Sequence, residues 1–270
     1  MIRAPLSTTS VLDESAEVVS MTGPGWVGLV ILATLPLRYL QAIFLDQLLE
    51  VGGNATHYGN LLGATANLIV LAILIATWGR AIYARACRLS LSRNGAPGRG
   101  AWRVPAPALA SYVLTSAAAA VLGYISIFTC IFTIGAVIFA GLAVGTMELN
   151  ERVSLTNPFK LIIRYLSHMR IQVALVFVFL CGVGVALANL GGAFAIGNWA
   201  AGALGGFDAP QWQTLFGNNR RYVLMLFAGA LATVEPFWIA AQVVYVRKAG
   251  AEESGDDLRS WFEEFRRSEA

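Results

Sequence analysis

The feature that most constrains this chain is a stretch without charge. No Asp, Glu, Lys or Arg occurs in the 44 residues between Arg103 and Glu148. As a helix, this stretch would extend about 66 Å, which is about twice the hydrocarbon core of a bilayer. A water-soluble domain, with its usual share of charged residues, rarely contains so long an apolar run. The stretch therefore predicts two membrane spans that fold back on each other, with the reversal near residues 126–130.

The composition also indicates an integral membrane protein. Hydrophobic residues make up 57% of the chain and charged residues 13%, the latter about half of the usual share in soluble domains. We expect an all-α, polytopic membrane helix bundle of about six transmembrane helices, with short amphipathic cytoplasmic helices. The expected spans are residues 26–44, 61–83, 108–127, 131–147, 171–190 and 223–245. The expected organisation is a cytoplasmic helix in 1–22, a membrane domain in 23–247 and an amphipathic cytoplasmic tail in 248–270.

The distribution of basic residues predicts the orientation. Alternation of sides places 16 of the 19 basic residues with the two termini and only Arg220 and Arg221 on the opposite side, while Arg38 falls inside the first span. The positive-inside rule then predicts that both termini are cytoplasmic and that the protein is a multi-pass protein of the cell membrane. The preference for Arg over Lys, together with abundant Ala and Gly, indicates a bacterial source.

Three segments outside the spans have readable patterns. Residues 10–20 predict a short capped helix whose Val11, Leu12, Val18 and Val19 rest on the membrane surface. Residues 88–107 contain Gly, Pro and Ser among arginines and predict a flexible cytoplasmic loop. The Gly-rich outer segment 191–222 fits two descriptions equally well, a partly re-entrant interfacial cap and an ordinary loop.

Residues 157–170 predict a basic amphipathic helix on the inner membrane surface. Lys160, Arg164 and His168 recur every four residues on one face, which makes them candidates for binding anionic lipid headgroups. In the alternative interpretation these residues only follow the positive-inside rule and anchor the fifth span. The tail carries Trp261 and Phe265 on one face of a second amphipathic helix, which either docks on its own chain or membrane or contacts a protein partner.

Charged residues inside spans are the usual signal of function in a membrane protein. Two occur here, Arg38 and Glu235, and insertion of such residues costs about 2.5–3.5 kcal/mol at a helix centre. Pro236 follows Glu235 and predicts a local break of the last span. Asn67 lies near the expected depth of Arg38 and could bond to it. These residues predict a polar site for a proton, an ion or a lipid headgroup; in the structural alternative, Arg38 extends toward the interface and Glu235 is protonated or bonds to a neighbour.

The sequence lacks the motifs of common metal, catalytic and phosphate-binding sites. His57 and His168 are expected on opposite sides of the membrane, so no two-His metal site is predicted. No HExxH, GxSxG or phosphate-binding loop motif occurs, and the cytoplasmic loops are short. We therefore expect no cofactor, no nucleic-acid partner and no enzymatic activity.

The chain resembles a known membrane domain at three places. These are residues 5–13 (Pro-Leu-Ser through Val-Leu-Asp), residues 148–170 (an acidic residue followed by a basic amphipathic helix), and residues 236–258, which contain Pro-Phe, Tyr-Val-Arg and Gly-Asp-Asp-Leu. The resemblance is to the six-span membrane domain of some bacterial glycerophosphoryl diester phosphodiesterases and of related stand-alone membrane proteins. We expect no catalytic barrel in this chain, so the resemblance implies a membrane module and not a hydrolase.

Two functions follow as hypotheses. The first is a non-enzymatic accessory or scaffold protein in the lipid bilayer that contacts a protein partner through its cytoplasmic tail. The alternative is a transporter or lipid-handling protein that uses a polar site at Arg38, Asn67 and Glu235.

Overall fold

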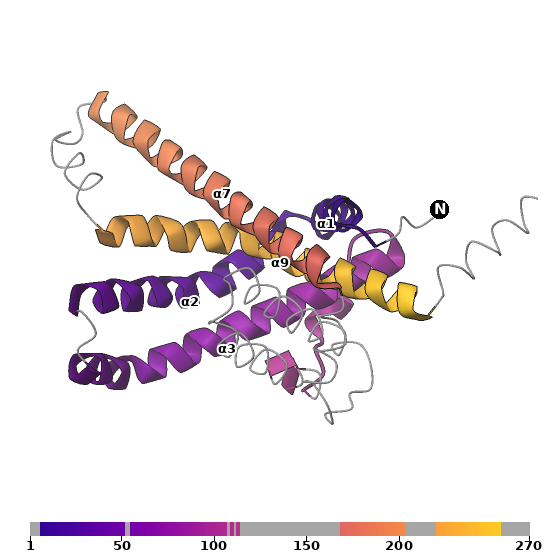
Figure 1. Cartoon of the computed structure of the whole chain (residues 1–270), viewed down its shortest axis with the longest axis horizontal. Helices are drawn as coiled ribbons and strands as arrows, with labels where there is room; N and C mark the ends of the chain where they lie inside the picture. The colour runs from indigo at the N-terminus through magenta and orange to yellow at the C-terminus, as the bar shows by residue number, and fades with distance from the viewer. Residues whose placement is uncertain are drawn as a thin grey trace, which may run out of the picture. The chain divides into compact units, whose positions relative to one another are not determined.

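The computed structural model describes residues 6–51, 55–106, 109–110, 112–113, 168–203 and 220–254. Within these ranges all regular secondary structure is helical, which confirms the all-α expectation for the described part of the chain (Figure 1). The elements are α1 (Thr8–Thr22), α2 (Pro24–Val51), α3 (Ala55–Arg93), the short 3-10 helix η1 (Arg99–Trp102), α7 (Met169–Ala203) and α9 (Arg220–Ser254).

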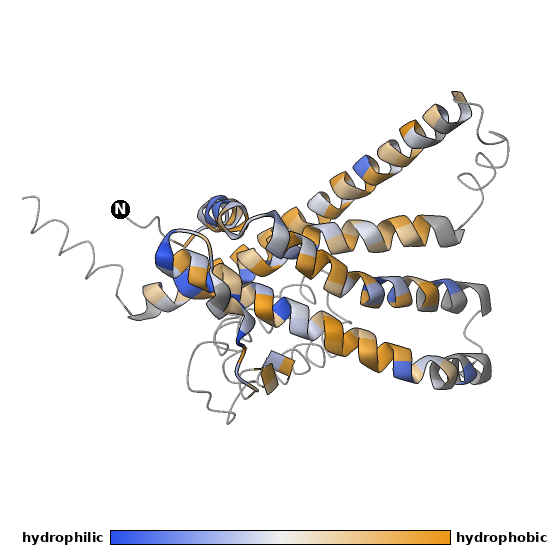
Figure 2. Ribbon diagram, turned by 180° about the vertical axis from the view of Figure 1, so that it is seen from behind, coloured by the Kyte–Doolittle hydropathy of each residue, from blue (hydrophilic) through white to orange (hydrophobic). Residues whose placement is uncertain are grey.

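Four helices are long and apolar enough to cross a membrane. They are the segments Pro24–Ile43, Gly63–Arg93, Met169–Gly197 and Val223–Glu252, with mean hydropathies between 1.5 and 2.6. Apolar residues dominate all four helices (Figure 2). They correspond to the first, second, fifth and sixth expected spans, as an integral membrane protein requires. The third and fourth expected spans, with the reversal near 126–130, lie outside the described residues.

The helices are longer than the sequence pattern predicts. The 39 residues of α3 extend about 58 Å and the 35 residues of α7 about 52 Å, both beyond a hydrocarbon core of about 30 Å. The predicted loop at 88–107 is therefore wrong in its first part, since residues 88–93 continue α3. The choice between loop and re-entrant cap at 191–222 is resolved for 191–203, which continue α7. Neither extension contains a proline, and apolar surroundings favour backbone groups that bond within one helix.

Local signals in the sequence set the ends of α1. The Ser7 hydroxyl accepts from the Ser10 amide at 3.2 Å, and the Ser10 hydroxyl accepts from the Ser7 amide at 3.2 Å, so the two residues form a capping box. Gly23 ends the helix with a φ of 82°, a conformation that glycine adopts without strain. Pro24 then occupies the first position of α2, where its missing N–H is not needed. The predicted capped helix at 10–20 is confirmed.

The chain divides into two compact units. The first comprises Met1–Val27, Ala81–Val178 and Phe237–Ala270. In its described part, Val11 and Val18 of α1 are fully buried, so the expectation that they rest on the membrane surface is wrong. Glu14 fixes α1 to α9, because its carboxylate lies 3.0 Å from the Lys248 ammonium and 3.4 Å from the Arg247 guanidinium. The apolar face of α1 is therefore part of a protein core.

The second unit comprises Gly28–Arg80 and Phe179–Pro236, which are parts of the four long helices. Large apolar side chains are exposed along it, among them Leu32, Leu68, Leu71, Leu74 and Val185. Exposed apolar surface of this extent is typical of a face that contacts lipid or another protein. Inside the unit, α7 and α9 approach at glycines, since a Cβ added at Gly229 would lie 3.5 Å from a methyl group of Leu190.

Candidate functional site

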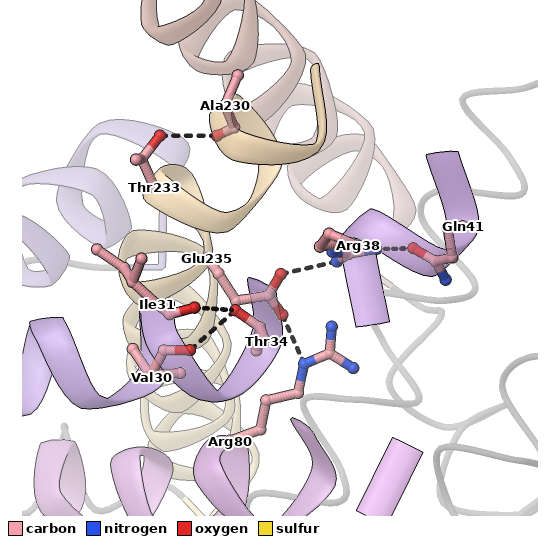
Figure 3. Close-up of polar contacts among 9 residues, drawn as sticks. All are labelled: Val30, Ile31, Thr34, Arg38, Gln41, Arg80, Ala230, Thr233 and Glu235. Carbon is pink, nitrogen blue, oxygen red and sulfur yellow. Dashed lines mark hydrogen bonds and ion pairs between the residues drawn. The ribbon is translucent and has the colours of Figure 1, made fainter. Parts of the chain in front are cut away.

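Three charged side chains from three helices meet inside the second unit. They are Arg38 of α2, Arg80 of α3 and Glu235 of α9 (Figure 3). Arg38 Nη2 lies 2.7 Å from Glu235 Oε2, and Arg80 Nε lies 2.6 Å from Glu235 Oε1. Each oxygen of one carboxylate therefore accepts from a different arginine. We call these three residues the charge cluster.

Burial determines what the charge cluster contributes to stability. Glu235 is only 2% exposed, and an ionised carboxylate without partners in such a position is strongly disfavoured. Charge-assisted hydrogen bonds of 2.6–2.7 Å are of the strong kind and compensate for that loss of hydration. Removal of one partner from a buried ion pair commonly costs about 3–5 kcal/mol. The charge cluster thus links α2, α3 and α9 at one point.

The helices that carry the charge cluster are not broken beside it. Pro36 lies inside α2 and Pro236 inside α9, and both helices continue through them. The predicted local break after Glu235 is therefore wrong. A proline removes one backbone hydrogen bond of the helix, and the remaining bonds preserve the helix where no water competes for them. The Thr34 hydroxyl donates to the Val30 carbonyl at 2.8 Å on the same stretch of α2 (Figure 3).

Helices α2 and α3 approach closely beside the charge cluster. A Cβ added at Gly79 would overlap the Cβ of Ala33, so only glycine fits at this position. Gly79 directly precedes Arg80 in the chain, and Ala33 lies about one turn before Arg38 on α2. Small residues at a helix contact let two backbones approach, as in many membrane bundles. This contact contributes to positioning both arginines near Glu235.

The two arginines are more accessible than the carboxylate that they hold. The side chain of Arg38 is 19% exposed and that of Arg80 is 17% exposed, against 2% for Glu235. Exposed aromatic residues occur within two positions of both arginines in the chain, Tyr39 at 42% and Trp78 at 45%. The accessible part of the charge cluster is therefore positive, and exposed aromatic residues occur on the same stretches of α2 and α3.

Arg38 makes a second polar contact, and one of its three nitrogens has no hydrogen-bond partner in the described ranges. Its Nη1 donates to the Gln41 Oε1 at 3.0 Å, one turn further along α2. Its Nε is buried and has no hydrogen-bond partner among the residues that the structure describes. Arg38 thus directs one nitrogen to Glu235, one to Gln41 and one to neither.

The structure brings together two of the three residues predicted for the polar site. Arg38 and Glu235, which the sequence predicts for one polar site, form an ion pair. Asn67 is exposed on α3, and none of the hydrogen bonds found in the described ranges joins it to Arg38 or Glu235. Asn67 precedes Arg80 by 13 residues, or about 20 Å along the helix.

Arg80 is the residue that sequence reasoning missed. Arg80 lies near the end of its expected span, and alternation of sides places it among the cytoplasmic basic residues that predict the orientation. A signal was available, since α3 continues as good helix-forming sequence to Arg93 and Arg80 therefore lies well inside the helix.

The other predicted binding residues are described only in part. Lys160 and Arg164 lie outside the described residues, and His168 is half-buried directly before α7. Trp261 and Phe265 of the tail also lie outside them. In the described ranges, no group of three or more His, Cys, Asp or Glu side chains is placed to hold a metal ion.

Comparison of this chain with family models, with curated proteins and with solved structures gives no match. The resemblance to the phosphodiesterase membrane domain therefore remains a prediction, and functional inference rests on the charge cluster and its surroundings.

Proposed function

We propose that this membrane protein is a lipid-handling protein that binds an anionic lipid headgroup through Arg38 and Arg80. The observation that carries the proposal is the difference in exposure within the charge cluster, where both guanidinium groups are partly accessible and Glu235 is buried. A ligand that reaches the charge cluster therefore meets positive charge. Guanidinium groups pair well with phosphate and carboxylate, because their N–H groups match two oxygens of one anion.

A lipid is the anion that the surroundings favour. Tyr39 and Trp78 are exposed on the same stretches of α2 and α3 as the two arginines, and such rings prefer the headgroup level of a bilayer. Leu68, Leu71 and Leu74 of α3 are exposed on the same unit and suit contact with acyl chains. A ligand with its headgroup on the arginines and its acyl chains along α3 is amphipathic, as a lipid is. A free anion would contact only the arginines.

Titration of the purified full chain with short-chain lipids tests this function. In an uncharged detergent, dioctanoyl phosphatidylglycerol should raise the thermal unfolding temperature, because a ligand at 100 times its Kd stabilises the folded state by about 2.7 kcal/mol. Dioctanoyl phosphatidylcholine, with no net charge, and inorganic phosphate, with no acyl chains, should have little effect. Equal stabilisation by inorganic phosphate would show a site for a free anion and contradict the lipid assignment.

Substitutions of single arginines show which residues bind the lipid. Arg38→Gln and Arg80→Gln should each lose most of the stabilisation by phosphatidylglycerol. Arg93→Gln is the matched control, since Arg93 is exposed at the end of the same helix as Arg80. A loss in the control as large as in the other two variants would indicate general attraction of anionic lipid to a basic protein.

The proposal includes a cell-membrane location, six spans and cytoplasmic termini. Its support is the strong asymmetry of basic residues, with 15 of 19 on the side of the termini once Arg80 is left out. The scaffold hypothesis is the alternative. It predicts that deletion of residues 252–270 removes co-purifying partner proteins and leaves membrane insertion intact, and an unchanged set of co-purifying proteins would contradict it.

A further inference from the structure

Two of the nitrogens through which an anion could bind at the charge cluster are already occupied. Arg38 Nη2 and Arg80 Nε both donate to Glu235, at 2.7 and 2.6 Å. An anion that pairs with these same two nitrogens therefore competes with the Glu235 carboxylate for them. Binding would leave that carboxylate buried and without its cationic partners, which is the most costly state for an ionised group.

Protonation of Glu235 would remove the cost of a buried, unpaired carboxylate. We propose that an anionic headgroup binds at the charge cluster together with one proton, which Glu235 takes up as its carboxylate leaves the arginines. The inference rests on the proposed function and adds a second ligand to it. Before binding, the charge cluster holds two positive charges and one carboxylate. Afterwards it holds the same two positive charges, the charge of the anion and a neutral acid, so its net charge does not change.

The ionisable groups around Glu235 support this assignment. The charges that face it are Arg38 from α2 and Arg80 from α3 (Figure 3). Helix α7 packs on α9 in this unit, and its residues 179–203 include no Asp, Glu, Lys, Arg or His and one exposed thiol, Cys181. Asp46, which is also buried, lies on α2 about 12 Å along the helix from Arg38. Glu235 is thus the acid in direct contact with both arginines.

Proton uptake by the wild-type chain is the measurement that tests the inference. Calorimetric titration with dioctanoyl phosphatidylglycerol, in two buffers of different ionisation enthalpy, gives the number of protons bound with each ligand. The phosphodiester of this lipid has one ionisation, far below neutral pH, so uptake near neutral pH comes from the protein. We expect about one proton per lipid, with a Kd that rises roughly tenfold for each pH unit between 6 and 8.

Substitutions of single acids show which side chain takes up the proton on lipid binding. Glu235→Gln should bind the lipid without proton uptake and with a Kd that does not depend on pH. Asp46→Asn, which changes the other acid that is buried in the described ranges, should retain both effects. Infrared difference spectra of the wild type should show the C=O band of a protonated carboxyl group on lipid binding, which tests the inference even if Glu235→Gln does not fold.

The possible results separate the two proposals. Lipid binding by the wild type without proton uptake would overturn the coupling and leave the proposed function standing. Uptake that is lost in Asp46→Asn and kept in Glu235→Gln would also overturn it, because the proton would then belong to a different acid. Absence of specific lipid binding at every pH would instead overturn the proposed function.

Discussion

Replacement of Glu235 by Gln is the perturbation that tests the structural role of the charge cluster. The substitution keeps the size of the side chain and removes the one negative charge that separates Arg38 from Arg80. Each arginine loses a charge-assisted ion pair of 2.6–2.7 Å, and the two cations then face each other in a site from which water is largely excluded.

The geometry sets the size of the effect. The paired nitrogens cannot be more than about 8 Å apart, because both bond to one carboxylate, and two unit charges at that distance repel by about 2 kcal/mol at an effective dielectric constant near 20. Loss of one partner from a buried ion pair costs about 3–5 kcal/mol in other proteins. We therefore expect Glu235→Gln to destabilise the fold by about 3–5 kcal/mol, or on the order of 10 °C in Tm.

Tryptophan fluorescence during heating in an uncharged detergent measures this change. Glu252→Gln is the matched control, since Glu252 is an exposed acid on the same helix, and its effect should stay below about 0.5 kcal/mol. Addition of Arg38→Gln to Glu235→Gln should restore part of the lost stability, because one of the two repelling charges is then removed. Equal Tm values for the Glu235 and Glu252 variants would refute the assigned role of the charge cluster.

Two further substitutions test the packing of each unit. Gly79→Ala should lower Tm strongly and weaken lipid binding, because the added Cβ would overlap Ala33. Gly63→Ala on the same helix meets open space and should lower neither Tm nor lipid binding. Equal effects of the two substitutions would contradict the close approach of α2 and α3. Glu14→Gln removes the partly exposed ion pair with Lys248 and should lower the free energy of unfolding by about 1 kcal/mol or less. Hydrogen exchange in α1 should then be faster. Unchanged exchange would show that the buried apolar face alone holds this helix in place.

The sequence predicts those features of the fold that depend on composition and on local signals. The four described spans follow from long apolar runs, and the pattern from Ser10 onward predicts α1. The structure places the ends of α1 at Ser7 and Gly23, whose roles depend only on near neighbours. Helix ends were predicted less well, because extension of α3 and α7 beyond the hydrocarbon thickness depends on what covers each helix. Periodicity and hydropathy of one segment do not contain that information.

The candidate site was predicted in part for a similar reason. Arg38 and Glu235 stand out because each interrupts an apolar span, and each needs a partner. Arg80 does not stand out, since it lies near other basic residues that the positive-inside rule explains. Its role depends on the alignment of α3 with α9, which brings residues 155 positions apart within 2.6 Å. Such an alignment is a property of tertiary packing and not of either helix alone.

Native mass spectrometry of the full chain tests most directly whether Arg38 and Arg80 bind an anionic headgroup. The chain is released from nanodiscs that contain equal amounts of phosphatidylglycerol and phosphatidylcholine. We predict that the wild type and Arg93→Gln retain phosphatidylglycerol preferentially, and that the Arg38→Gln/Arg80→Gln double variant loses this preference. The same preference in all three proteins would contradict the assignment of the headgroup site to the charge cluster.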